Sequence, residues 1–183
     1  MDKSIGSVWG KWDFHIHTPY SILNSDYGFN PFDPHDNYHE KEFDQFVVRL
    51  FTKAVSENIV AIGITDYFLV DGYKRIKEEY LEKPEKLRQC FPDEVLRNKV
   101  QEIFVFPNIE LRINTFVGNH THSVNYHVIF SDEVSIQDIE ENFINKLTFT
   151  KNPGDNLSLT KHNLTEYGND LKHDNEKKAI LCI

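Results

Sequence analysis

The first 66 residues alternate between segments with different hydrophobic periods. At residues 11–17, apolar and polar positions alternate, which is typical of a half-buried β-strand. Residues 42–57 instead place apolar side chains three and four positions apart, which predicts an amphipathic helix ending near Asn58. The nearly continuous apolar run at 59–66 predicts a strand buried on both faces, so the three segments together indicate a βαβ unit.

The rest of the chain continues this alternation. A loop predicted at 18–41 is long for a compact domain, and loops of this length are often functional. The other predicted elements are, in chain order, a helix from Asp71, a helical region at 84–101 broken at Pro92 and capped by Asp93, a strand at 102–110, a polar turn region at 114–123, a strand at 124–130, a helix capped by Ser135 with Asp138, a loop at 148–159, a helix from Thr160 and a strand at 179–183.

Alternating strands and helices place the chain in the α/β class, with parallel strands and outer helices in a sheet that is open or closed into a barrel. In either form, the chemistry gathers at the carboxyl ends of the strands. A length of 183 residues suffices for one domain with a real core, so we expect a single domain over 1–183. Because the sequence stops within an apolar strand, we expect it to be the N-terminal part of a longer protein.

Composition narrows the function classes. The formal net charge of −9 argues against a free-standing electrostatic nucleic-acid binder, but a nuclease stays open because a bound metal supplies positive charge at the phosphate. The two cysteines, Cys90 and Cys182, lie far apart without a Cys-x-x-Cys motif, which fits a reducing cytosol. The sequence shows neither a signal-peptide pattern nor an apolar run of ~20 residues, so we expect a cytoplasmic protein without a membrane partner.

The first predicted strand carries the strongest candidate chemistry. Asp13, His15 and His17 occupy alternate positions, so we expect their side chains to share one face, with Trp12, Phe14 and Ile16 on the other. A carboxylate and two imidazoles are preferred donors for a divalent transition metal. Nine histidines in this chain would give about 0.4 His-x-His pairs by chance, so a purely structural pair is the alternative.

Each of the next three strands also carries a polar candidate at or near its end. These candidates are Asp66, Glu110 and His127. Four strands that each offer a metal-competent side chain are harder to explain by chance than one His-x-His motif. The other histidines, His35, His39, His120 and His122, fall in predicted polar loops, and Cys90 is expected to pack. Glycine-rich nucleotide-binding motifs are absent from the sequence.

These segments resemble the first motifs of a known family. The motifs are Asp-Phe-His-Ile-His-Thr-Pro-Tyr-Ser from Asp13, Gly-Ile-Thr-Asp ending at Asp66, Asn-Ile-Glu ending at Glu110 and Tyr-His-Val-Ile around His127. In this order, and over about residues 9–183, they resemble the PHP (polymerase and histidinol phosphatase) domain family. The resemblance implies a distorted (β/α)7 barrel that holds two or three divalent metal ions, zinc, manganese or iron, and hydrolyses phosphoesters.

The resemblance also implies roles for individual residues. His15 and His17 would bind one metal, Glu110 would bridge metals, and His127 would bind another. Asp13 would orient an imidazole, and we count it with Asp66 and Tyr67 as a candidate catalytic residue. In-line attack by a metal-activated water would then cleave the ester, without a side-chain nucleophile.

The sequence departs from the family pattern at Tyr67, where the family usually has a ligand histidine. A phenol, mostly protonated near neutral pH, binds metals less readily. The family's closing Asp-x-His and a preceding ligand histidine would fall beyond Ile183. The Tyr67 variant is similar to the branch in which a PHP-like domain precedes an SMC-like or AAA-like ATPase, the TrlF type of bacterial anti-phage defence. This similarity implies an ATPase domain in the same longer chain.

Two classes of function follow from these observations. The first is a metal-dependent phosphoesterase, a nuclease domain acting on nucleic acid or on a nucleotide phosphoester, and compatible with a homo-oligomer. The second is a non-catalytic PHP-like regulatory or interaction module that has lost a ligand at Tyr67. An amidohydrolase-type barrel also starts with His-x-His, but it would call for a bridging lysine, which the fourth predicted strand does not offer.

Overall fold

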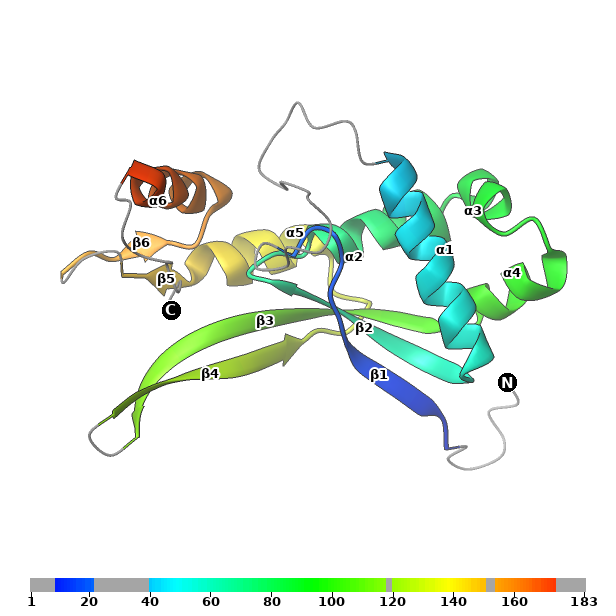
Figure 1. Ribbon diagram of the computed structural model, residues 1–183, viewed down its shortest axis with the longest axis horizontal. Coiled ribbons are helices and arrows are strands. Elements are labelled where there is room, and N and C mark those ends of the chain that lie inside the picture. The colour runs from blue at the N-terminus through cyan, green and yellow to red at the C-terminus, as the bar shows by residue number, and fades with distance from the viewer. Residues whose placement is uncertain (1–8, 22–39, 118–119, 151–153, 174–183) are drawn as a thin grey trace.

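A curled four-stranded sheet forms the centre of the computed structural model, which describes residues 9–21, 40–117, 120–150 and 154–173 (Figure 1). The strands lie in the order β1-β2-β3-β4. Their bounds are β1 (Lys11–Ile16), β2 (Ile59–Tyr67), β3 (Phe104–Val117) and β4 (His120–Ile129). The first three strands are parallel, whereas β4 runs antiparallel to β3. The α/β class is confirmed, and the sheet is mostly parallel.

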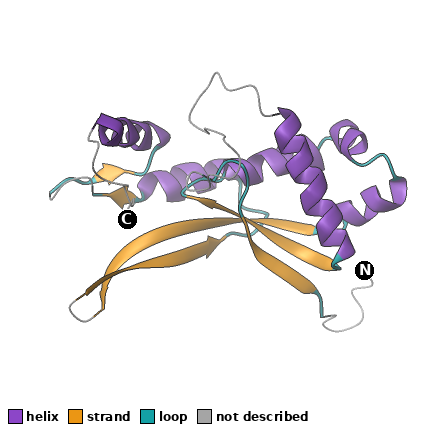
Figure 2. Ribbon diagram, in the orientation of Figure 1, coloured by secondary structure: helices purple, strands orange, loops and turns teal. Residues whose placement is uncertain are grey.

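The helices lie on one side of this sheet, as the colouring by secondary structure shows (Figure 2). In chain order they are α1 (Glu40–Ser56), α2 (Asp71–Arg75), the π-helical η2 (Ile76–Leu81), α3 (Pro84–Cys90), α4 (Glu94–Gln101), α5 (Ile136–Asp138), the π-helical η3 (Ile139–Phe143), the 3-10 turn η4 (Ile144–Lys146) and α6 (Lys161–His173). The opposite side of the sheet is bare of helices in the part of the chain that the structure describes.

The core lies between the sheet and these helices. The predicted helix at 42–57 is confirmed as α1, whose apolar stripe is buried through Phe43, Phe46, Val47, Phe51 and Ala54. It ends before Asn58, which adopts a left-handed φ of 56°, a conformation that asparagine tolerates better than most residues. Across the core, Ile62 and Ile64 of β2 are almost fully buried, as expected for an apolar strand beneath helices.

The predicted helix starts are confirmed where a side chain caps the backbone. The Asp93 carboxylate accepts the N–H of Leu96 at 2.7 Å, which begins α4 after the break at Pro92. The Ser135 hydroxyl accepts the N–H of Asp138 at 3.0 Å at the start of α5. Each of these bonds satisfies an N–H that would lack a partner within the helix.

Two parts of the predicted fold are wrong. The polar turn region at 114–123 consists instead of paired strands, because β3 continues to Val117 and β4 begins at His120. The two intervening residues are too few for a helical crossover, so β4 must be antiparallel and not parallel. The predicted loop at 148–159 contains a small two-stranded sheet, β5 (Thr148–Phe149) with β6 (Leu157–Ser158). The predicted strand at 179–183, together with His35, His39 and Cys182, lies outside the described residues.

Candidate metal centre

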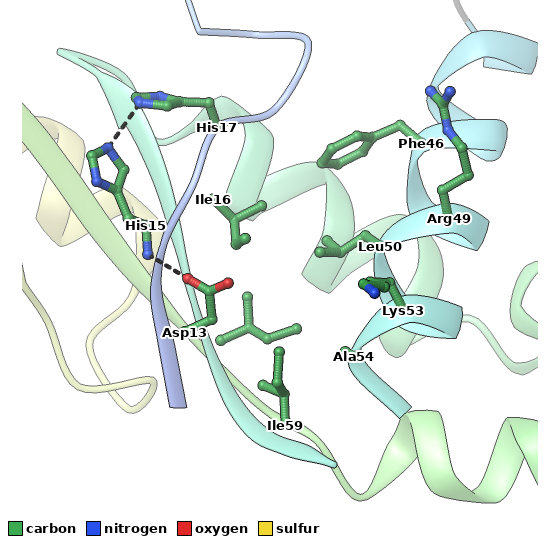
Figure 3. Close-up of a pocket in the computed structure, with 11 residues that line it drawn as sticks. Asp13, His15, Ile16, His17, Phe46, Arg49, Leu50, Lys53, Ala54 and Ile59 are labelled. Carbon is green, nitrogen blue, oxygen red and sulfur yellow. Dashed lines mark hydrogen bonds between the residues drawn. The ribbon is translucent and has the colours of Figure 1, made fainter. Parts of the chain in front are cut away.

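A β-bulge in β1 decides which of its side chains meet. Asp13 pairs with Ile62 and Ile16 pairs with Ile64, so β1 uses one more residue than β2 over this stretch. The extra residue breaks the expected alternation. Asp13 and Ile16 point toward α1, whereas the rings of His15 and His17 turn toward each other away from that helix (Figure 3). The expectation that Asp13 shares a face with both histidines is therefore wrong, because Asp13 lies on the side of Ile16. Ile16 itself faces away from the two histidine rings, as expected.

Because of this bulge, the imidazoles of His15 and His17 both lie next to Glu110 of β3. His15 Nε2 lies 3.0 Å and His17 Nε2 lies 3.3 Å from Glu110 Oε2, and the two nitrogens are 3.0 Å apart. One ligand atom from each residue thus falls within 4.8 Å of the others, a spacing that could hold a metal ion. Two imidazole nitrogens and a carboxylate oxygen form a donor set found in catalytic zinc sites, which leave further positions for water or substrate.

Glu110 is the most deeply placed member of this group. Its side chain is fully buried, and within the described part of the chain its Oε1 has no hydrogen-bond partner. An ionised carboxylate with an unsatisfied oxygen is costly in such a place unless a positive charge compensates it. A cation bound between Glu110 and the imidazoles would supply that compensation, so the residues present fit a divalent metal.

The surroundings of His17 favour its neutral, unprotonated form. Burial lowers its pKa below the usual 6.5, an effect that the charge of Glu110 opposes and the neighbouring imidazoles reinforce. Its second ring nitrogen, Nδ1, lies 3.0 Å from the hydroxyl of Ser21, which fixes the orientation of the ring. Since a metal needs an unprotonated imidazole nitrogen, the lowered pKa keeps His17 available for binding near neutral pH.

His127 lies beside this group but does not belong to the three residues that converge. It sits directly opposite Glu110 in the pairing of β3 with β4, and its ring meets that of His15 edge-on at 4.8 Å. Its Nδ1 lies 3.2 Å from the side-chain nitrogen of buried Asn108. The same Asn108 nitrogen donates to the carbonyl of Phe14 at 2.7 Å, which ties β1 to β3 next to the bulge.

Asp66 lies away from the three converging residues. Its two oxygens accept the N–H and the hydroxyl of Thr18 at 2.9 and 2.8 Å, which anchors the segment that follows His17. A Cβ on Gly72 would lie 2.1 Å from this carboxylate, so only glycine fits there. Burial raises the pKa of Asp66 to about 7, although the bonds from Thr18 act in the opposite direction. Asp66 therefore holds the segment at Thr18 in place, and its predicted catalytic role stays a prediction.

Tyr67, the next residue, lies against the candidate metal-binding group of His15, His17 and Glu110. Its ring stacks on that of His17, with centroids 4.9 Å apart and an angle of 18° between the planes. Burial and the charge of Glu110 raise the pKa of Tyr67, so its phenol stays protonated at neutral pH. Phe68 follows with a left-handed φ of 60°, uncommon for a bulky residue, and its N–H donates to the carbonyl of Glu110 at 3.2 Å.

Three supporting residues lie at this site for which no specific role was predicted from the sequence, although Ser21 belongs to the motif that begins at Asp13. Asn108 and Ser21 hold the bulge and His17 as described above, and Arg112 contacts Tyr67. The signal for Arg112 was present, because residues two apart on a strand share a face and Arg112 follows Glu110 by two. The role of Asn108 depends on a contact between segments far apart in the sequence, whereas Ser21 lies only four residues after His17.

A pocket of about 400 Å³ lies between β1 and α1, and His15 and His17 are among the residues that line it (Figure 3). Ile16, Phe46 and Leu50 form part of its apolar wall, and its charged side chains come from Asp13, Arg49 and Lys53. Within this pocket, the carboxylate of Asp13 accepts the backbone N–H of His15 at 3.1 Å.

Fold and site together define an α/β protein whose curled, mostly parallel sheet carries a candidate His-His-Glu metal centre. Comparison with protein-family models, curated proteins and solved structures gives no match for this chain. Among the described residues, none of the helices is long and apolar enough to cross a membrane.

Proposed function

We propose that this chain is a metal-dependent phosphoesterase domain. The observation that carries the proposal is the convergence of His15, His17 and Glu110 from separate strands, with the carboxylate fully buried and one of its oxygens free of partners among the described residues. Burying a charge in this way lowers stability, and such a cost is common where a protein binds a cation. The resemblance of the sequence to PHP domains supports the same class of reaction.

The residues of the chain divide the work between binding and orientation. A divalent cation held here would lower the pKa of a bound water and draw charge from the phosphoryl oxygens. His15 and His17 supply imidazole nitrogen donors, and Ser21 keeps the ring of His17 in place. Glu110 supplies the negative charge, and the resemblance to PHP domains implies that His127 would bind a second cation. Tyr67 shields one side of His17 from water.

The proposal extends to substrate, cofactor and partners through the resemblance to PHP domains of the TrlF type. We propose zinc, manganese or iron as the metal, with two or three ions in a complete barrel. The substrate would be nucleic acid or a nucleotide phosphoester, and cleavage would be coupled to an ATPase domain of the same longer chain in anti-phage defence.

The test of this proposal replaces both imidazoles, His15→Ala with His17→Ala, in the full-length protein. Hydrolysis of bis-p-nitrophenyl phosphate and of DNA is measured with added manganese or zinc. We expect a loss of at least about a hundredfold, because the donors that hold the cation are gone. His162→Ala is the matched control, since His162 is exposed on α6. Unchanged cleavage by the double variant would refute the proposal.

One observation favours a second candidate, a non-catalytic regulatory or interaction module. The protonated phenol of Tyr67 stands where the resembled family has a ligand histidine, and its raised pKa makes it a poor metal donor. Metal analysis of the full-length protein separates the two candidates. Fewer than one tightly bound transition metal per chain would favour the module, whereas one or more would favour the phosphoesterase.

A further inference from the structure

The side chain of Arg112 lies next to the candidate metal centre. It is half-buried on β3, two residues beyond Glu110 and therefore on the same face of the strand. Two residues along a strand correspond to about 6.7 Å. The guanidinium is thus placed within the reach of a phosphoryl group that also contacts a cation at Glu110.

The guanidinium is held by Tyr67. Its Nη2 donates to the Tyr67 hydroxyl at 3.3 Å, and its central carbon lies 5.3 Å from the centre of that ring. The Tyr67 ring also stacks on His17, at 4.9 Å between centroids. His17, Tyr67 and Arg112 therefore form a continuous packed row that leads outward from the metal-binding group.

The charge of Arg112 is not neutralised by a nearby acid. In the part of the chain that the structure describes, no carboxylate lies within ion-pair distance of its guanidinium, although Glu110 is only two residues away. A guanidinium has five N–H donors, and the bond to Tyr67 uses one of them. The remaining donors form a planar fork that matches the oxygens of a phosphate.

We infer that Arg112 binds the non-bridging oxygens of the substrate's phosphoryl group and that Tyr67 positions its guanidinium for this purpose. The inference rests on the proposed phosphoesterase function and adds the residue that recognises the anion. It also gives Tyr67 a role other than metal binding: its ring orients His17, and its ring and hydroxyl orient Arg112.

The test measures binding of inorganic phosphate to the manganese-loaded full-length protein by isothermal titration calorimetry. Arg112→Ala is expected to weaken phosphate binding by at least about tenfold, because it removes charge-assisted hydrogen bonds to the phosphate oxygens. Arg112→Lys keeps the charge but not the fork, and we expect intermediate binding. Tyr67→Phe removes the hydroxyl and keeps the ring, so its loss should be smaller than that of Arg112→Ala.

Arg88→Ala is the matched control, because Arg88 is an exposed arginine on α3 and does not line the pocket that contains His15 and His17. It should bind phosphate like the wild type. Manganese content, measured on the same samples, should be equal in all variants. Phosphate binding by Arg112→Ala equal to that of the wild type, or a manganese-loaded wild type that binds no phosphate, would overturn the inference alone. A wild-type protein that binds no manganese would instead refute the proposed function.

Discussion

At the scale of single residues, Glu110 shows the energetic cost of burying a carboxylate at a candidate metal site. Its side chain is fully buried, yet Oε1 has no partner within the described residues, and Oε2 contacts two imidazoles. In the absence of a cation, this arrangement relies on histidine protons to balance a buried charge. Burial lowers the pKa of His17, which makes that protonation less favourable. The residue is therefore better suited to a cation than to a structural ion pair.

The variant Glu110→Gln tests this trade-off. We expect the metal-free variant to be at least as stable as the wild type, because an amide is cheaper to bury than a carboxylate. We also expect it to lose the stabilisation by metal, which for the wild type is about 2.7 kcal/mol at a metal concentration of 100 times Kd. Thermal melts with and without zinc or manganese measure both effects. Exposed Glu102→Gln is the control, and full metal stabilisation of Glu110→Gln would contradict the assignment.

At the scale of elements, the bulge in β1 is the feature that assembles the site. Asp13 holds it by accepting the backbone N–H of His15 at 3.1 Å, and Asn108 holds it from β3 through the carbonyl of Phe14 at 2.7 Å. Without the extra residue, strict alternation would place His15 on the side of Asp13, facing α1. The bulge therefore brings His15 into the candidate metal centre, and bulges are common next to binding sites.

Asp13→Ala is expected to loosen this bulge without removing a metal donor. By comparison with other groups that orient metal ligands, the metal affinity should fall by about tenfold or more. Asp13→Asn keeps an acceptor oxygen for the His15 N–H and should lose less. Competition with a chromophoric zinc chelator measures the affinities. Equal metal affinity in the wild type and Asp13→Ala would show that Asp13 does not position His15.

Asp66 ties the segment after β1 to the body of the protein, and its ionisation should be visible in the pH dependence of stability. Because its pKa is raised to about 7 in the folded protein, folding favours the protonated acid. The protonated form makes its full contribution to the free energy of unfolding below pH 3.8, which is the usual pKa of an aspartic acid. This contribution is lost as the pH rises toward about 7, the pKa in the folded protein. Asp66→Asn cannot ionise and should lack this loss, which amounts to a few kcal/mol.

Urea denaturation at pH 5 and pH 8 checks this expectation. The free energy of unfolding of Asp66→Asn, compared with that of the wild type at the same pH, should be higher at pH 8 than at pH 5. A difference between the two proteins that does not change with pH would mean that Asp66 ionises normally in the folded chain.

Most elements, but not their exact partners, could be predicted from the sequence. The periodicity of α1 and the apolar run of β2 depend on local order, and both are confirmed. The bulge could not be predicted, because it arises from how Asp13 and Ile16 pair with a strand more than 40 residues away. The place of Asp66 could have been inferred, since Asp66 and Tyr67 are neighbours on one strand and must face opposite sides.

At the scale of the whole molecule, the two faces of the sheet differ. Helices cover one face, whereas the other carries partly exposed aromatic side chains, such as Trp12 and Phe14, whose rings lie 5.3 Å apart. Phe14 also contacts the ring of Phe106 at 5.2 Å, and Phe106 shares a face of β3 with Glu110. A closed barrel, as the resemblance to PHP domains implies, would place these rings and the metal-binding residues in its interior. Closure stays a prediction.

The central claim is that His15, His17 and Glu110 jointly bind one divalent metal. Anomalous diffraction from crystals of the full-length protein, collected at the zinc, iron and manganese edges, tests it most directly. The account predicts an anomalous peak about 2.0–2.3 Å from both Nε2 atoms and from a carboxylate oxygen of Glu110. Imidazoles that remain bonded directly to Glu110, with no anomalous peak between them in metal-soaked crystals, would contradict it.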